Sequence, residues 1–504
     1  MKTKIKLIVL LLGLAGTAFA QTNINQLQQQ LQQELETIVK TDNLPGATLA
    51  VVLPDDQLLS LSAGYNDKEA QTPMLPGARM FSGSVGKTLV AAVLLQIMEE
   101  QGISLDAKVA PFFVDQEWFS RIPNANELTI RMLMQHTSGI PRYIQQEAFL
   151  EDLKANPMKT RTPAELLSYV LDMEPTHPAG KGWGYSDTNF LILGMLIEKW
   201  SGNTFYNQTE KRVIKPLGLR NTFPSDQRDL LGLTQGYIGD HNFFFLPPKT
   251  IKDGLYAINP QFEWTGGGFV TNVEDLAQFI KATHEGKIIP ETYYPEMLKA
   301  VDYRTGQPAE AGYGLANFVW NTSNGIHYGH AGIFPGHLTR VDYVKDHGFS
   351  LALQYNTDQG LGRTMGSQLE KISDLVIDAI NAQPNADEAA ILANFEQQEK
   401  CWNQADIDCY MQAYHPAIDI KTISQAGVMY GYENIRRQYK RYWNAENMGQ
   451  LHFDQLRLQT LTEDFYLVTG RFNLKYDKQM RQGHFSAVFQ KIDGKWYMVS
   501  DHSS

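Results

Sequence analysis

Hydrophobic residues recur at steps of three and four near the start of the chain, between residues 24 and 39. This spacing predicts an amphipathic helix that docks its apolar face on the protein and leaves a glutamine-rich face outside. The apolar positions are Ile24, Leu27, Leu31, Leu35 and Ile38. Two apolar runs follow, at 46–53 and 57–64, and the turn signal Pro54-Asp55-Asp56 between them predicts a β-hairpin.

Residues 84–101 are apolar on nearly every side, which predicts a buried helix, and Gly102 supplies its C-terminal stop. Weaker patterns predict helices at 163–172, 189–200, 273–283 and 367–382, and strands near 313–320, 338–344 and 349–355. Strands at both ends of a helix-rich middle indicate an α+β fold whose sheet is closed by its two termini.

The periodicity stops in a polar, proline-bearing stretch around residues 382–387, which indicates a domain boundary. We therefore expect a first domain at 21–383, a linker at 384–388 and a second domain at 389–504. Helical patterns at 388–403, 406–414 and 431–443 precede alternating stretches at 451–461, 464–476 and 483–500.

The first twenty residues have the pattern of a signal peptide. MKTKIK is basic, LIVLLLGLAG is apolar, and Thr17-Ala18-Phe19-Ala20 ends in a small-x-small cleavage site. The apolar run is about half as long as a bilayer span. We expect residues 1–20 to direct export, to the periplasm or the exterior, and we expect no membrane anchor.

Composition narrows the functional classes. With 43% hydrophobic and 20% charged residues the chain is an ordinary globular protein, and its formal charge of −11 argues against nucleic-acid or anionic-membrane binding.

The two cysteines are Cys401 and Cys409. On one unbroken helix they would be ~12 Å apart, beyond disulfide reach. A bridge requires a break near Asp406; two unpaired thiols are the alternative.

Ser84 and Lys87 open the buried helix with the spacing Ser-x-x-Lys. Positions i and i+3 share a helix face, so the Lys87 ammonium can reach the Ser84 hydroxyl. Burial and the helix dipole are expected to lower the pKa of Lys87, so that the neutral amine takes the serine proton. The Ser84 backbone N–H, free at the helix start, can meet an oxyanion. A helix-capping serine beside a solvated lysine is the structural alternative.

Three further segments carry polar groups in turns. Tyr185, in the turn before an apolar helix, can share proton transfer with a nearby lysine. His330-Ala331-Gly332 allows close backbone approach, so the N–H of Ile333 can be a second oxyanion donor. His136, in the turn QHTSGIP, is interpreted as structural.

Several segments together resemble the serine β-lactamases and penicillin-recognising hydrolases of the class C type, over roughly residues 25–382. The segments are LTIRMLMQHTSGIP, PAGKGWGYSDTNF, VIKPLGLRNTF, WTGGGFVTNVEDLAQF and YGHAGIFPGH. The resemblance implies a β-lactamase/transpeptidase-like fold, with an antiparallel sheet, flanking helices and an all-α subdomain. It also implies Ser84 as acylated nucleophile, Lys87 and Tyr185 as base and proton shuttle, and Ser84 and Ile333 as oxyanion donors. No cofactor or metal is implied.

Two departures from that family's pattern bear on the substrate. Asp187 replaces the asparagine of Tyr-x-Asn and adds negative charge, and His330 replaces the lysine of Lys-Thr-Gly and is mostly neutral at pH 7. His-x-Gly is similar to the esterase and D-amino-acid peptidase branches. We therefore expect hydrolysis of small esters or peptide-like amides, with His330 hydrogen-bonded to Tyr185. A β-lactamase or D-Ala-D-Ala carboxypeptidase is the alternative within the family.

Two alternatives come from other classes. His327, His330 and His337 lie within eleven positions and could supply the three ligands of a zinc hydrolase. A catalytically inactive binding protein that keeps the fold is the other, although Ser84, Lys87 and Tyr185 are all present.

Residues 388–504 resemble the SnoaL-like, nuclear-transport-factor-type cone fold. The likeness rests on Trp402-Asn403 with Asp406, on Gly431-Tyr432-Glu433, and on the terminal segment HFSAVFQKIDGKWYMVSDHSS. It implies helices inside a curved sheet and a binding role, or a homodimer through this domain. The aromatic residues either line a pocket for a small apolar ligand or pack as core: Trp402, Tyr410, Tyr414, Trp443 and Trp496. Asp501-His502 is either an acid–base pair or structural, and no catalysis is assigned to it.

Overall fold

The computed structural model describes residues 21–382, 385–416, 419–424, 427–476 and 479–504. Two compact units make up the chain, the first spanning Gln30–Leu375 and the second containing Val376–Ser504. The predicted signal peptide at 1–20 lies outside the described residues. Among those described, no helix has the length and apolar character needed to cross a bilayer.

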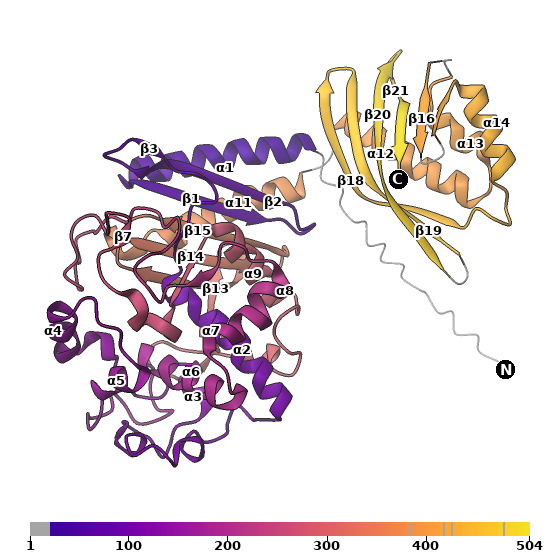
Figure 1. The fold of residues 1–504 in the computed structure, drawn as a ribbon. Coiled ribbons are helices and arrows are strands. Elements are labelled where there is room, and N and C mark those ends of the chain that lie inside the picture. The colour runs from indigo at the N-terminus through magenta and orange to yellow at the C-terminus, as the bar shows by residue number, and fades with distance from the viewer. Residues whose placement is uncertain (1–20, 383–384, 417–418, 425–426, 477–478) are drawn as a thin grey trace, which may run out of the picture. The chain divides into compact units, whose positions relative to one another are not determined.

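A ten-stranded sheet forms the first unit's centre, in the order β10-β9-β11-β12-β13-β14-β15-β1-β2-β3 (Figure 1). β1 pairs antiparallel with β15, so the first hairpin and the last strand close the sheet as predicted, and the α+β class is confirmed. The strands are β1 (Gly46–Val52), β2 (Leu58–Asp67), β3 (Thr72–Pro73), β9 (Ala300–Val301), β10 (Pro308–Ala309), β11 (Gly312–Tyr313), β12 (Phe318–Thr322), β13 (Gly325–Phe334), β14 (His337–Val344) and β15 (Phe349–Tyr355).

Two details of the sheet differ from the sequence prediction. The strand expected at 313–320 is interrupted, because the chain turns between β11 and β12 with Ala316 at φ 53°. β13 was not predicted as a strand, since its three glycines dilute the alternation of apolar and polar side chains. β13 nevertheless pairs along its whole length with β14 or β12, and it carries His330 and Ile333 to the site.

Helices cover both faces of the sheet. α9 (Val273–His284) packs Leu276, Ala277 and Ile280 against the small residues Ala50 and Ala352 of β1 and β15. On the other face lie α1 (Gln21–Thr41) and α11 (Met365–Asn381), joined by the Lys371–Glu34 ion pair (Figure 1). The apolar positions predicted for α1 are buried, as an amphipathic docking helix requires.

A second core of the first unit is built mainly from helices and loops below the sheet in Figure 1. α2 is buried on nearly all sides and ends at Gly102 in a left-handed conformation, as predicted. α5 is shorter than the predicted 163–172, because Val170 N–H bonds to Leu167 and tightens the chain after Ser168. The remaining bounds are α2 (Gly86–Gln101), α3 (Ile130–Met134), α4 (Glu147–Ala155), α5 (Pro163–Ser168), α6 (Asp187–Ser201), α7 (Phe205–Thr209), α8 (Lys215–Leu217) and α10 (Tyr294–Met297). Short strands flank this region: β4 (Met80–Phe81), β5 (Phe223–Pro224), β6 (Ile251–Lys252), β7 (Leu255–Tyr256) and β8 (Phe269–Thr271).

The second unit packs helices against a six-stranded sheet in the order β17-β16-β21-β20-β19-β18. The stretch predicted at 483–500 is two strands, because the turn Asp493-Gly494 reverses the chain. A helix also begins inside the predicted linker, since the Asn385 side chain caps the N–H groups of Asp387 and Glu388. The bounds are α12 (Ala386–Asn403), α13 (Ile407–Tyr410), α14 (Tyr432–Tyr442), β16 (Lys421–Ser424), β17 (Gly427–Tyr430), β18 (Gln450–Thr462), β19 (Phe465–Lys475), β20 (Met480–Ile492) and β21 (Lys495–Ser503).

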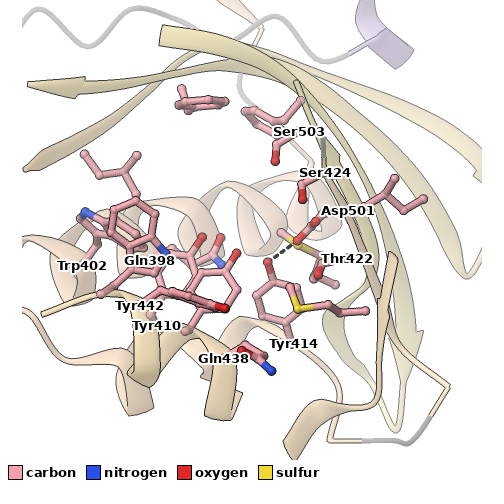
Figure 2. A pocket seen from close by; sticks show the side chains of 18 of the residues that line it. Gln398, Trp402, Tyr410, Tyr414, Thr422, Ser424, Gln438, Tyr442, Asp501 and Ser503 are labelled. Atoms are coloured by element: carbon pink, nitrogen blue, oxygen red, sulfur yellow. Dashed lines mark hydrogen bonds between the residues drawn. The ribbon is translucent and has the colours of Figure 1, made fainter. Parts of the chain in front are cut away.

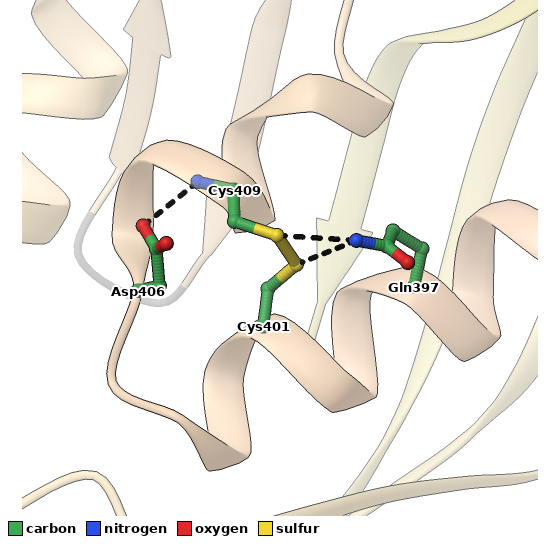
Figure 3. The surroundings of a disulfide bond; sticks show 4 residues. All are labelled: Gln397, Cys401, Asp406 and Cys409. Carbon is green, nitrogen blue, oxygen red and sulfur yellow. Dashed lines mark hydrogen bonds between the residues drawn. A yellow bond between two sulfur atoms is a disulfide. The ribbon is translucent and has the colours of Figure 1, made fainter.

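The two cysteines form a disulfide between α12 and α13 (Figure 3). The break that the sequence argument required is present: α12 ends at Asn403, and Asp406 caps α13 by accepting a hydrogen bond from Cys409 N–H. The chain reversal brings the two Cα atoms to 5.4 Å.

Replacing Cys401 and Cys409 together by alanine should lower the stability of the second unit by about 2–3 kcal/mol, because a short loop in the unfolded chain is no longer closed. Thermal unfolding of oxidised wild type and variant checks this. Reductant should lower the melting temperature of the wild type alone, and equal melting temperatures without reductant would contradict the prediction.

Candidate active site

Ser84 and Lys87 lie at the start of α2 and face each other. β4 leads into a 3₁₀ turn, η1 (Gly83–Val85), and α2 follows at Gly86, so Ser84 stands in the turn and not inside the α-helix as predicted. The Lys87 Nζ atom lies 3.0 Å from Ser84 Oγ. Lys87 is fully buried, whereas Ser84 is partly exposed. A substrate can therefore reach the hydroxyl while the ammonium stays away from bulk water.

Lys87 donates two further hydrogen bonds, and the prediction that its pKa is lowered is wrong. Its ammonium bonds Asp187 Oδ1 at 2.6 Å and the backbone oxygen of Gly266. Burial disfavours the charged form, but the acidic groups around it, Asp187 foremost with Tyr185 and Glu263, together outweigh burial and raise the pKa of Lys87 above its ordinary value. Lys87 is therefore an ammonium in the resting protein.

Asp187 is shared between two cations, Lys87 and Arg142. The Arg142 guanidinium donates to Asp187 Oδ2 from Nε at 2.9 Å and from Nη2 at 2.6 Å. Burial opposes ionisation, yet Arg142 and Lys87 together hold the pKa of Asp187 well below its ordinary value. Asp187 is therefore ionised and adds the expected negative charge, but Lys87 and Arg142 neutralise that charge, which the sequence did not predict. Sequence reasoning missed Arg142, because no motif spacing links it to a residue 45 positions away.

Tyr185 lies beside Lys87, whose Nζ atom is 5.0 Å from the centre of the tyrosine ring. The buried Tyr185 hydroxyl makes no hydrogen bond of full geometry with the described residues, but Ser84 and Lys87 lie close enough to lower its pKa. Burial raises the pKa of this phenol, and the ammonium of Lys87 opposes that effect. A phenol this close to the serine and the lysine can take part in proton transfer at the site.

His136 positions the segment that carries Tyr185. Its Nδ1 atom accepts hydrogen bonds from Ser186 N–H at 3.1 Å and from the Asn189 amide at 3.2 Å, and its ring lies 4.1 Å from the Tyr185 ring. Burial holds the pKa of His136 well below its ordinary value, so the ring is neutral. The structural interpretation of His136 agrees with these contacts.

His330 contacts Tyr313, and the predicted hydrogen bond to Tyr185 is absent. The Tyr313 hydroxyl lies 2.9 Å from His330 Nε2, and His330 Nδ1 lies 2.7 Å from the Ala331 oxygen. The ring centres of His330 and Tyr185 are 6.4 Å apart, because Tyr313 from β11 stands closer to the imidazole. Burial and the nearby Lys87 lower the pKa of His330 to about 3, so the predicted neutral imidazole is present.

The backbone N–H of Ile333 lies next to the Ser84 turn. A Cβ atom added to Gly83, which has φ 50°, would lie 2.6 Å from Ile333 N, and one added to Gly332 would lie 3.0 Å from Ser84 N. Only glycines let β13 and η1 approach this closely. The Ile333 side chain is 46% exposed. The backbone nitrogens of Ser84 and Ile333 thus belong to two segments in close contact, as an oxyanion hole built from both would need.

Glu263, which sequence reasoning missed, is a buried carboxyl group within the electrostatic reach of Lys87, Asp187 and Arg142. Burial raises the pKa of Glu263 to about 7, against the attraction of Lys87. The next residue, Trp264, has the strained backbone angles φ 37° and ψ −115°. Strain of this kind is often found at functional sites. The signal available in the sequence was an acid inside the apolar segment FEWTGGGF.

Glu263→Gln should gain stability relative to wild type as the pH rises. Folded wild type keeps the Glu263 proton up to about pH 7, whereas the unfolded chain releases it near the ordinary pKa of 4.5. Wild type therefore loses stability between these pH values, by up to ~3 kcal/mol, and glutamine does not. Thermal unfolding at pH 5 and pH 8 measures the difference. The exposed Glu117→Gln variant should show none, and a pH-independent effect of Glu263→Gln would contradict the prediction.

The zinc alternative is wrong. His327 and His330 are three positions apart on β13 and therefore point to opposite faces of the sheet. His337 pairs with Phe334, at the other end of the ladder from the pair His327–Val344. His327 bonds Asp342, and His337 bonds the backbone oxygen of Thr234. The described part of the chain contains no cluster of three His, Cys, Asp or Glu side chains able to hold a metal ion.

Comparison with known proteins agrees with both resemblances. A family model described as Beta-lactamase matches residues 28–369, and one described as SnoaL-like domain matches residues 391–504. A D-aminopeptidase of Brucella anthropi is 26% identical over 63% of this chain and 57% of its own length. Unguisins hydrolase ungD' of Aspergillus campestris is 26% identical over 65% of this chain and 62% of its own length.

The chain thus spans about three fifths of the length of these curated relatives. Among solved structures, a D-stereospecific amidohydrolase from a Streptomyces species superposes with a TM-score of 0.59 at 28% identity. That match covers 70% of this chain and 98% of the amidohydrolase.

Proposed function

Because the chain belongs to the beta-lactamase family of serine hydrolases, we propose that it hydrolyses small esters or amino-acid amides through an acyl-enzyme on Ser84. The observation that carries the proposal is the contact of 3.0 Å between Ser84 Oγ and Lys87 Nζ. The close backbone contact between the Ser84 turn and Ile333 supports it, because it brings two N–H donors into one region.

In the proposed reaction Ser84 Oγ attacks the substrate carbonyl, and the oxyanion that forms accepts hydrogen bonds from the backbone N–H groups of Ser84 and Ile333. The carbon–nitrogen or carbon–oxygen bond then breaks, and the leaving group takes a proton from the site. Water attacks the Ser84 ester in the second half of the reaction and releases the acid.

Lys87 and Tyr185 would handle the serine proton as a pair. The resting ammonium of Lys87 already donates to Ser84, Asp187 and Gly266, so it cannot accept a proton in that state. When Lys87 and Tyr185 together lose one proton, the pair can act as the base. The positive charge of Lys87 favours loss of that proton from the nearby Tyr185 hydroxyl. We therefore expect the rate of hydrolysis to rise with pH as this pair loses its proton.

The neutral His330 favours substrates without a carboxylate next to the scissile bond, because it provides no charge to pair with one. The similarity to proteins named D-aminopeptidase and D-stereospecific amidohydrolase supports amides of D-amino acids as one substrate class.

Turnover of matched chromogenic substrates by the purified full chain tests the substrate class. p-Nitrophenyl butyrate or D-alanine p-nitroanilide should be turned over fastest, the L-alanine anilide more slowly than the D form, and a chromogenic cephalosporin slowest. Cephalosporin turnover equal to that of the best ester would favour the β-lactamase alternative and overturn the argument from His330.

We also propose export, supported by the basic and apolar pattern of residues 1–20. N-terminal sequencing of the secreted or periplasmic protein should find Gln21 first.

Homodimerisation through the second unit, which the cone-fold likeness implies, is tested by sedimentation of the full chain; a monomer at micromolar concentration would contradict it.

A further inference from the structure

The second unit contains a cavity of about 790 Å³ between its helices and its sheet. This is the size of sites that hold small molecules. Figure 2 shows the rings of Trp402, Tyr410 and Tyr442 on one side of it and Asp501, with neighbouring hydroxyl groups, on the other. We call it the C-terminal cavity.

Aromatic side chains form much of the wall. Trp402 packs against Tyr410 and Trp443, with ring centres 5.3 and 5.4 Å apart, and Tyr410 packs against Tyr439 at 5.6 Å. Trp496 follows the core alternative, since it packs on Tyr466 and donates to Asp387. The wall suits a flat apolar body, and its ring faces attract cations.

Several buried polar groups of the lining have no partner among the described residues. Gln398 is 1% exposed, and neither its amide nitrogen nor its oxygen is hydrogen-bonded. The Thr422 hydroxyl and the Gln438 side-chain oxygen are also unsatisfied. Buried polar groups are normally paired, so this set indicates a missing ligand. Acceptors outnumber donors once the carboxylate of Asp501 is included.

None of the described lining residues places a cation opposite Asp501. Its carboxylate accepts a hydrogen bond from Tyr414, and the other titratable groups facing it are the phenols of Tyr410 and Tyr439. Arg481 is the one basic side chain among the described lining residues; it is exposed and forms no ion pair with Asp501. Burial raises the pKa of Asp501 to about 6, so an ionised carboxylate faces the cavity at pH 8.

We propose that the C-terminal cavity binds a small molecule with an apolar, aromatic body and one protonated amine, which pairs with Asp501. The amine supplies the missing cation and the missing donors, and the ring faces hold the body. Neither the geometry nor the test depends on the hydrolase activity proposed for the first unit.

Calorimetric titration of the full chain at pH 8 with 2-naphthylmethylamine and 2-naphthylmethanol tests the proposal. The two probes differ in charge and share their body, so the amine should bind at least tenfold more tightly. Asp501→Asn should weaken amine binding at least tenfold and leave the alcohol unchanged. Asp464→Asn removes an exposed acid of the same domain and should leave both affinities unchanged.

Three results would overturn the proposal: no amine binding at millimolar concentration, equal affinity of wild type for amine and alcohol, or an unchanged amine affinity in Asp501→Asn. The comparison of the two probes needs no variant, so it decides the question even if Asp501→Asn does not fold.

Discussion

Ser84→Ala should lower hydrolysis of the best substrate by about 10⁴-fold or more, since no acyl-enzyme can form without the hydroxyl. The fold should persist, because Ser84 is partly exposed and the substitution removes only a hydroxyl group, to which Lys87 donates. Turnover and covalent labelling by a fluorophosphonate, read by mass spectrometry of the intact chain, measure the effect.

Labelling distinguishes the serine hydrolase from an inactive binding protein. Wild type and Ser168→Ala, which changes an exposed serine on α5, should both gain one label, and Ser84→Ala should gain none. Labelling that survives in Ser84→Ala would assign the nucleophile elsewhere. An unlabelled wild type would support the inactive binding protein.

Asp187→Asn should cost about 3–5 kcal/mol of stability, because it leaves two buried or half-buried cations to share a neutral amide. In the wild type Asp187 bonds both Lys87 and Arg142, and the side chains of Lys87 and Asp187 are at most 2% exposed. Thermal unfolding of the first unit measures the loss. Asp172→Asn breaks the exposed pair with Arg121 and should cost less than about 1 kcal/mol.

The same variant should change the pH dependence of hydrolysis. Without the carboxylate, burial prevails and the pKa of Lys87 falls, so the rising limb of kcat/KM should move to lower pH. Adding Arg142→Gln to Asp187→Asn should restore part of the stability, since it removes one of the two cations that have lost the Asp187 carboxylate. Loss of stability equal to that of Asp172→Asn, or an unmoved pH limb, would contradict this account.

The sequence predicted the fold best where a pattern was local. The apolar repeat of α1, the buried helix ending at Gly102 and the pair Ser84–Lys87 depend on neighbours a few residues apart, and the structure contains all three. β13 was not predicted because its three glycines weaken the strand pattern, and one of them, Gly332, lets the strand approach Ser84 closely.

The site's electrostatics depended on contacts that no local pattern contains. Asp187, 100 positions from Lys87, raises the pKa of that lysine together with Tyr185 and Glu263, which reverses the expected sign. Arg142 keeps Asp187 ionised. Tyr313 likewise takes the place beside His330 that the sequence argument gave to Tyr185. Such pairings follow from tertiary packing.

The position of β1 in the large sheet has a consequence for folding. β1 lies between β2 and β15, with Ala47 opposite Tyr355. The free edge of β1 in the N-terminal hairpin can therefore pair only with β15, near the end of the first unit. Pairing between segments so distant in sequence slows folding. We expect refolding of this unit to be slow, and chains ending before β15 to expose an unpaired β1 edge and aggregate.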